Sequence, residues 1–90
     1  MRLKDKAVII TGGAGGIGSG MARAMAKEGA KVAIVDLNEE QGNAVVTELQ
    51  KISPDSMFIK ADLTERKKLH EIVDTVVEKY GKLDVLVNNA

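Results

Sequence analysis

Short apolar runs and longer amphipathic segments alternate along the whole chain. Each short run is nearly unbroken and rich in β-branched residues, a pattern typical of strands that are covered on both faces of a parallel sheet. In the longer segments the apolar residues recur at helical spacing. The pattern predicts the order β-α-β-α-β-α-β. The expected strands are residues 7–11, 31–36, 57–59 and 84–88, and the expected helices are residues 17–29, 38–52 and 64–80.

Local signals indicate where each helix begins and ends. Residues 38–41 (N-E-E-Q) match a capping box, and Thr64 is suited to cap the third helix. Gly29 and Gly81 are suitable left-handed ends, and residues 53–55 contain the proline that ends the second helix. The apolar stripes expected to face the sheet are Ile17, Met21, Ala24 and Met25, then Val45, Leu49 and Ile52, then Leu69, Ile72, Val73, Val76, Val77 and Tyr80.

Strands that alternate with helices imply right-handed crossovers, a parallel sheet and helices on both of its faces. In a doubly wound sheet of this kind the chain runs outward from strand one to strands two and three. It then returns, so that strand four lies on the other side of strand one. We therefore expect one α/β domain over residues 1–90 with a ligand crevice at this reversal.

Composition narrows the class of protein further. The chain has 90 residues, 13 basic and 13 acidic side chains and no cysteine. It has no block of like charges that would attract nucleic acid or lipid headgroups, and it has no thiolate metal site or disulfide. No segment approaches the ~20 apolar residues of a membrane-spanning helix. We expect a cytoplasmic protein with no nucleic-acid, membrane or metal partner.

A glycine-rich segment lies between the first strand and the first helix. Residues 11–18 (T-G-G-A-G-G-I-G) match G-x-G-x-x-G in one register and T-G-x-x-x-G-x-G in another. Glycines in this context allow a tight turn and a close approach to a pyrophosphate, which the helix N-terminus attracts. The alternative is a tight turn with no ligand. A triphosphate loop is excluded, because Ser19-Gly20 stands where Lys-Ser or Lys-Thr is required. The candidate cofactor contacts in this segment are Gly12, Gly13, Gly15, Gly16 and Gly18.

Asp36 ends the second strand, about 20 residues after the glycines. A carboxylate at this place accepts hydrogen bonds from the 2′-hydroxyl of an adenosine ribose and repels a 2′-phosphate. Leu37 and Asn38 follow, and neither is basic. The acidic residue and the lack of a basic neighbour therefore favour NAD over NADP. The alternative is that Asp36 only begins the loop or caps the second helix.

These residues together resemble the short-chain dehydrogenase/reductase family, and the resemblance runs from Lys6 to Ala90. It is carried by T-G-x-x-x-G-x-G over residues 11–18, by Asp-Leu over residues 62–63 and by Asn-Asn-Ala over residues 88–90. The resemblance implies a Rossmann-type fold and an NAD-dependent oxidoreductase. The roles it implies are Gly12 and Ile17 at the pyrophosphate, Asp36 and Leu37 at the adenosine ribose, Asp62 and Leu63 at the adenine, and Asn89 and Ala90 along the cofactor. Two alternatives stay open, in which Asp62 is an ordinary loop residue and Asn88 is a structural brace.

The same resemblance implies that the catalytic groups are absent from this chain. The family's serine and its Tyr-x-x-x-Lys pair would follow residue 90, and Tyr80 does not replace them because Asp84 stands where the lysine is needed. No set of residues that would support proton transfer by His70 is visible in the sequence, so His70 is expected to be an exposed helical residue. The intact parent is expected to transfer hydride between NAD and a secondary alcohol or ketone, and relatives are commonly oligomers. This chain, truncated after strand four, is expected to bind the adenosine half of the cofactor weakly, to turn nothing over and to leave strand four as an unpaired edge.

Two other classes of protein remain as alternatives. An adenosylmethionine-dependent methyltransferase also places a glycine turn and an acidic residue at these positions, although Thr11 stands where that fold usually has a carboxylate. A non-catalytic dinucleotide sensor would use the same binding residues.

Overall fold

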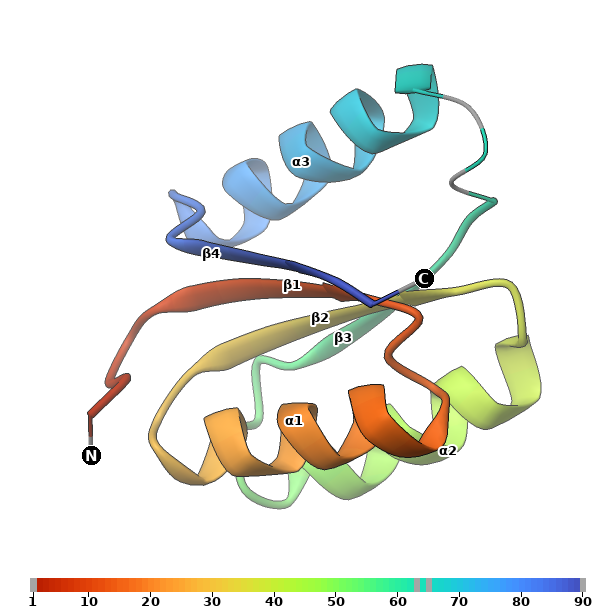
Figure 1. Cartoon of the computed structure of the whole chain (residues 1–90). Coiled ribbons are helices and arrows are strands. Elements are labelled where there is room, and N and C mark those ends of the chain that lie inside the picture. Colours follow the sequence, from red (N-terminus) through yellow and green to blue (C-terminus); the bar gives the residue numbers. More distant parts are fainter. Residues whose placement is uncertain (1, 63, 65, 90) are drawn as a thin grey trace.

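The computed structural model describes residues 2–62, 64 and 66–89. It contains the seven elements in the expected order (Figure 1). Leu63 and Ala90, two of the expected cofactor contacts, lie outside the described residues. The elements are β1 (Ala7–Thr11), α1 (Gly16–Lys27), β2 (Lys31–Asp36), α2 (Glu39–Gln50), β3 (Met57–Lys60), α3 (Arg66–Tyr80) and β4 (Val85–Asn88).

The four strands form one parallel sheet in the order β3-β2-β1-β4. The reversal expected from the sequence is therefore confirmed, because β4 pairs with β1 on the side away from β2. The register pairs Thr11 with Val35 and with Asn88, and it pairs Asp36 with Lys60. All four carboxyl ends thus lie at the same edge of the sheet, where a parallel α/β domain binds its ligand.

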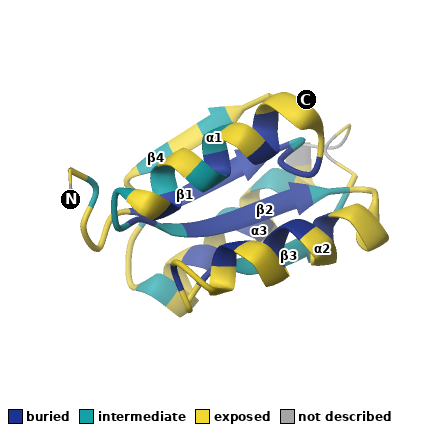
Figure 2. Ribbon diagram, turned by 90° about the horizontal axis from the view of Figure 1, so that it is seen from below, coloured by how far each residue is buried: buried dark blue, intermediate teal, exposed yellow. Residues whose placement is uncertain are grey.

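Helices cover both faces of the sheet. Helices α1 and α2 lie on one face and α3 lies on the other (Figure 1). Side chains alternate along β1 and β2, so that Val8 and Ile10 pack in the first core with α1 and α2, and Ile9 packs in the second core with α3. Both central strands are buried along nearly their whole length (Figure 2). This explains why their sequences are continuous apolar runs.

The buried face of α1 differs from the expected stripe. Ile17 is 75% exposed and Ala24 is also exposed, while Met21 and Met25 are only partly buried. Small side chains form the buried face, because a helix that follows a tight glycine turn begins close to the sheet and leaves no room for large ones. The buried residues are Gly18, Ser19, Ala22 and Ala26.

The stripes of the other two helices are mostly as expected. Val45 and Leu49 are buried on α2, and Ile72 and Val76 are buried on α3. The prediction is wrong for two residues, Ile52 and Val77, which were expected in the core and are exposed. Ile52 follows the end of α2 and is no longer on its helical face, and Val77 lies on a flank of α3 that no described element covers.

The start of α2 and the two glycine ends follow the sequence signals, with one change at α2, whereas the expected Thr64 cap of α3 stays a prediction because the start of α3 adjoins residues outside the described part of the chain. Asn38 caps α2 by accepting a hydrogen bond from the Gln41 amide, at 3.0 Å. The reciprocal half of the capping box is replaced, because the Asn38 amide donates to the Asp36 carboxylate instead. Gly29 and Gly81 both have positive φ, as expected for residues that end a helix.

Gly42 is a position where packing requires glycine. A Cβ atom at this buried position of α2 would lie well inside contact distance of the Phe58 ring on β3. We expect Gly42→Ala to lower the free energy of unfolding by about 1–3 kcal/mol, because the crowding outweighs the better helix propensity. Gly20→Ala is the control, since a Cβ atom at Gly20 meets nothing within 4 Å. Urea unfolding of both variants measures the difference, and equal stability would contradict the packing explanation.

Asp84 ties the beginning of β4 to the beginning of β1. Its carboxylate accepts a hydrogen bond from the Ala7 amide at 2.8 Å and lies 3.3 Å from the Lys82 ammonium. The Ala7 amide, and then the Lys82 and Lys6 charges, hold the pKa of Asp84 below its usual range. A folded-state pKa that is lowered gives stability that is present above about pH 4 and is lost as the pH falls through the folded value.

We therefore expect Asp84→Asn to be less stable than the wild type at neutral pH, and we expect this difference to disappear in acid. Urea unfolding of both proteins from pH 7 to pH 2 measures it. A difference that stayed constant with pH would show that the Asp84 charge is not the cause.

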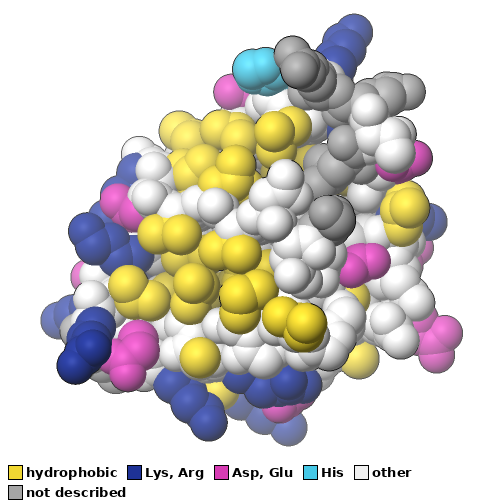
Figure 3. Space-filling model, viewed as in Figure 1, with side chains coloured by type: hydrophobic (Ala, Val, Ile, Leu, Met, Phe, Trp, Pro, Cys, Tyr) yellow, Lys and Arg dark blue, Asp and Glu magenta, His cyan; other side chains and the backbone are white. Residues whose placement is uncertain are grey.

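Strand β4 is an edge of the sheet, as the sequence predicted. Its central side chain, Leu86, is 44% exposed. Figure 3 shows hydrophobic side chains gathered on the side of the molecule that β4 borders, beside α3 and beside α1. An exposed apolar edge of this kind favours association, so self-association of the isolated chain stays a prediction.

Candidate functional site

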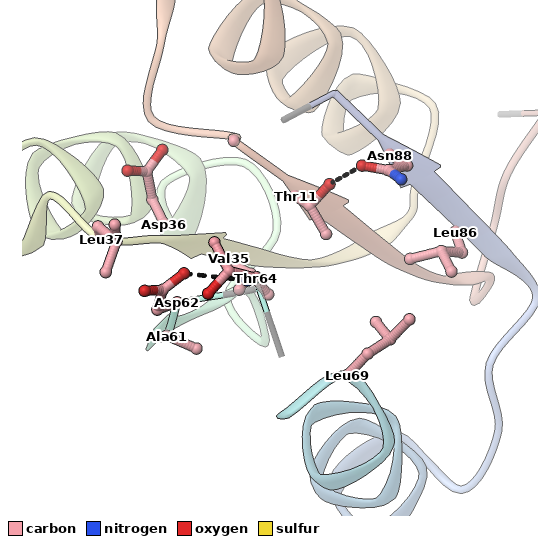
Figure 4. A pocket seen from close by; sticks show the side chains of 11 residues that line it. Thr11, Val35, Asp36, Leu37, Ala61, Asp62, Thr64, Leu69, Leu86 and Asn88 are labelled. Atoms are coloured by element: carbon pink, nitrogen blue, oxygen red, sulfur yellow. Dashed lines mark hydrogen bonds between the residues drawn. The ribbon is translucent and has the colours of Figure 1, made fainter. Parts of the chain in front are cut away.

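The carboxyl ends of all four strands contribute to one pocket of about 530 Å³ (Figure 4). It lies at the topological reversal between β1 and its neighbours, where the sequence predicted a ligand crevice. Of the expected cofactor contacts, Gly12, Asp36, Leu37 and Asp62 line it together. The remaining described lining residues are Thr11, Val35, Ala61, Thr64, Leu69, Leu86 and Asn88.

The glycine-rich loop turns sharply at Gly12, beside this pocket. Gly12 has φ +66°, a left-handed conformation that favours glycine, and its amide donates to the Val35 carbonyl at 2.8 Å. A Cβ atom at Gly13 would lie 2.7 Å from the Ile34 side chain, and one at Gly18 would lie 2.4 Å from the Gly12 carbonyl oxygen. These glycines let the loop and the first turn of α1 pack directly on the sheet.

The N-terminus of α1 offers unpaired backbone amides. Gly15 is the N-cap residue and has no side-chain cap, and the first turn of the helix contains no acidic side chain. Among the described residues no acceptor binds the amides of residues 16–18, whereas the Ser19 amide already donates to the Gly15 carbonyl. Three free donors at the positive end of a helix form a site for an anion, and phosphate groups are its usual occupants.

Asp36 lies between the pocket and the glycine-rich loop. One carboxylate oxygen accepts a hydrogen bond from the Ala14 amide at 3.1 Å, and the other accepts from the Asn38 amide at 3.0 Å. Asp36 does not cap α2, because Asn38 does so. An ionised carboxylate has about four lone-pair positions, so about two remain for a ligand in the pocket.

Asp62 follows β3 and faces Thr64 across a short turn. Its carboxylate accepts a hydrogen bond from the Thr64 backbone amide at 3.0 Å (Figure 4). That amide, and then the Thr64 side chain, lower the pKa of Asp62, so its charged form is favoured. The pocket thus has two carboxylates and an apolar lining between them, an arrangement that suits a sugar and a flat base rather than an anion.

The end of β4 is tied to the end of β1 through the Thr11 hydroxyl. Thr11 is buried, and its hydroxyl donates toward the Asn88 side-chain oxygen at 3.0 Å (Figure 4). The same hydroxyl accepts from the Asn89 amide at 3.1 Å. The Asn89 side-chain amide reaches the Gly12 carbonyl at 3.4 Å. This geometry supports the interpretation of Asn88 as a structural brace.

Two residues important to this geometry were not singled out from the sequence. From the sequence, Thr11 has no contact role beyond the glycine motif and the argument against a methyltransferase, and Ala14 is only a variable position within the motif. The Thr11 contacts join residues 77 and 78 positions apart, which no local pattern reveals. The Ala14 contact is made by the backbone, so the identity of the side chain gives no sign of it.

Other titratable groups lie away from the pocket. The Tyr80 hydroxyl donates to the Asp55 carbonyl, and burial, followed by the charge of Asp55, raises the pKa of Tyr80 above its usual value. Tyr80 is thus held in a structural contact at the far end of α3. His70 is exposed, as expected. Over the described part of the chain, no three His, Cys, Asp or Glu side chains are grouped to hold a metal ion.

The fold and the position of the site are those of the Rossmann class of α/β domains. The chain belongs to the short-chain dehydrogenase family, whose model matches residues 6–90. A nicotinamide dinucleotide is the cofactor of that family. This assignment overturns the methyltransferase alternative.

Several characterised dehydrogenases are similar to the chain. It is 43% identical over 89 residues to 2,5-dichloro-2,5-cyclohexadiene-1,4-diol dehydrogenase of Sphingobium indicum, covering 99% of this chain and 36% of the relative. It is 39% identical over 90 residues to the 7alpha-hydroxysteroid dehydrogenase of Escherichia coli, covering 100% and 35%. Among solved structures, an NAD⁺-bound xylitol dehydrogenase has a TM-score of 0.95 and 30% identity, with 100% of this chain and 35% of that chain covered.

The chain spans about a third of the length of these relatives. None of the described helices is long and apolar enough to cross a membrane.

Proposed function

We propose that this chain binds the adenosine diphosphate half of NAD, and that the protein to which it belongs transfers hydride between NAD and a secondary alcohol or ketone. The proposal rests on the position of two kinds of group, the free amides of the first helix and the Asp36 carboxylate. Gly12 and Asp36 line a pocket at the carboxyl ends of all four strands, and the turn that begins at Gly12 leads directly to the three free amides at the start of α1.

The residues present fit the cofactor part by part. The amides of residues 16–18 suit the pyrophosphate, and the free lone pairs of Asp36 suit the hydroxyls of the adjoining ribose. Leu37 and Asp62 line the part of the pocket beyond Asp36, where the adenine belongs. The Asn89 side-chain amide reaches the Gly12 carbonyl at 3.4 Å, so Asn89 would lie along a cofactor bound at this turn. When bound, the nicotinamide supplies or accepts the hydride.

NAD is preferred over NADP on electrostatic grounds. Two carboxylates, Asp36 and Asp62, line the pocket, and none of its described lining residues is lysine or arginine. A 2′-phosphate would therefore meet like charge at Asp36 without a cation to offset it. The presence of NAD⁺ in the similar xylitol dehydrogenase is consistent with this choice.

Calorimetric titration with NAD and with NADP tests both parts of this proposal. We expect saturable binding of NAD that is at least about tenfold tighter than that of NADP, a difference of about 1.4 kcal/mol. Asp36→Ala should reduce the difference in affinity between NAD and NADP, because it weakens NAD binding and removes the charge that repels the 2′-phosphate. No saturable heat with either cofactor would contradict the binding site, and tighter binding of NADP would contradict the preference.

The catalytic step belongs to residues outside this chain. The pocket contains no tyrosine, lysine or histidine among its described residues. We expect the 90-residue chain to bind NAD without reducing it when secondary alcohols are added, as followed by absorbance of the reduced nicotinamide. A non-catalytic sensor remains the second candidate, and it predicts the same absence of turnover in the protein to which the chain belongs.

A further inference from the structure

Asp36 has a second set of contacts that its proposed role in ribose binding does not explain. The Ala14 amide donates to it at 3.1 Å, and this is the one hydrogen bond among the described residues that ties residues 13–16 to the sheet. The Gly12 amide, at the start of the turn, donates to the Val35 carbonyl at 2.8 Å, whereas the two contacts that the Gly12 carbonyl accepts are longer. The Gly15 amide and the Asn89 side-chain amide both reach the Gly12 carbonyl, each at 3.4 Å.

A hydrogen bond to an ionised acceptor is stronger than one between neutral groups. The carboxylate is itself fixed by the Asn38 amide on its other oxygen, at 3.0 Å. Ala14 is buried, so water does not readily replace the carboxylate as its acceptor. We infer that Asp36 is a positioning residue, which holds the glycine-rich loop in the conformation that aims the free amides of residues 16–18 at a pyrophosphate before any cofactor binds.

This inference rests on the proposed function only where it concerns the pyrophosphate. It assigns one carboxylate to two tasks, because the oxygens that would accept the ribose hydroxyls already order the loop. Ribose and pyrophosphate binding are then coupled through Asp36. Removal of Asp36 should weaken a ligand even when that ligand has no ribose hydroxyl to lose.

Amide hydrogen exchange of the chain without cofactor tests whether Asp36 holds the glycine-rich loop. In the wild type the Ala14 amide should exchange about tenfold or more below its intrinsic rate, the protection expected of a hydrogen bond to a charged group, while the Gly16 and Ile17 amides exchange near theirs. Asp36→Ala should remove the protection at Ala14 while amides of the central strands stay protected. Free exchange of Ala14 in the wild type would overturn the inference without any variant.

Binding of 2′,3′-dideoxyadenosine 5′-diphosphate tests whether Asp36 also affects diphosphate binding, because this probe has the diphosphate and lacks both ribose hydroxyls. Loss of a negative charge alone would strengthen the binding of an anion, so weaker binding by Asp36→Ala than by the wild type cannot come from the lost charge. We expect Asp36→Ala to bind the probe about fivefold or more weakly than the wild type does. Equal or tighter binding by Asp36→Ala would show that Asp36 acts on ribose hydroxyls alone.

These outcomes separate the inference from the proposed function. If the wild type binds NAD but Ala14 is unprotected, the positioning role fails and the function stands. If Ala14 is protected through Asp36 but no nucleotide binds, the positioning of the loop stands and the function fails. Asp36→Asn keeps the shape of the side chain and satisfies only one of its two amides, so it supplies the same comparison if Asp36→Ala does not fold.

Discussion

Gly18→Ala is expected to destabilise the protein and to abolish measurable NAD binding. A Cβ atom at this position would lie 2.4 Å from the Gly12 carbonyl oxygen and 2.8 Å from the Gly13 Cα atom. Both are backbone atoms, so the clash is relieved only if the loop or the start of α1 moves away from the sheet. Overpacking of this kind costs about 1–3 kcal/mol, and the displaced loop no longer aims the amides of residues 16–18 at a phosphate. Urea unfolding and calorimetric titration with NAD measure the two effects.

Other glycines of the same helix provide matched controls for Gly18. Gly16 and Gly20 have nothing within 4 Å of a Cβ atom. Gly16→Ala, in the same turn, should leave the free energy of unfolding unchanged or slightly higher, because alanine is the better helix former. Gly20→Ala lies one turn further along and serves as the control for NAD binding. If Gly18→Ala were as stable and as active in binding as Gly20→Ala, the close approach of α1 to the loop would not be the reason for glycine at position 18.

Thr11→Val is expected to give the second largest loss of stability. The substitution keeps the shape of the side chain and removes a hydroxyl that is 2% exposed. Without it the Asn88 side-chain oxygen loses its donor at 3.0 Å and the Asn89 amide loses its acceptor at 3.1 Å. Asn88 and Asn89 are exposed, so water can replace part of each lost contact, and each hydrogen bond is worth about 0.5–1.5 kcal/mol. We expect a total loss of about 1–3 kcal/mol, together with weaker NAD binding, because Asn89 is no longer held beside Gly12.

Thr11→Ser separates the hydroxyl from the methyl group. It keeps both hydrogen bonds and loses one methyl, which costs about 1 kcal/mol. Thermal unfolding of the two variants, with NAD titrations of each, makes the comparison. If Thr11→Val proved as stable as Thr11→Ser, the hydroxyl would not be what holds the end of β4 on β1.

Much of the fold follows from local sequence patterns. The central strands are buried on both faces, so their composition alone predicts them, and the order of elements then fixes a parallel sheet with its reversal at β1. The buried face of α1 could not be predicted in the same way, because Ile17 and the methionines are the apolar residues at helical spacing while small residues make the contact. Hydropathy does not detect a helix that packs through glycine, serine and alanine.

The site follows from sequence to the extent that it depends on spacing. The glycines and Asp36 are about 20 residues apart across one β-α-β unit, so the pattern places them at the same edge of the sheet. The links that complete the site are of another kind. Thr11 meets Asn88 and Asn89 only because β4 pairs with β1, and Asp36 meets Ala14 through a backbone amide. Neither contact has a counterpart in local sequence.

The cofactor site is tested most directly by titrating the ¹⁵N-labelled chain with NAD and following the shifts of individual backbone amides. We expect one saturable process whose largest shifts fall at residues 16–18 and at Asp36, Leu37 and Asp62, with little change at the amino-terminal ends of the strands. A titration that shifts no amide, or one whose largest shifts lie away from the start of α1 and the carboxyl ends of the strands, would contradict the cofactor site.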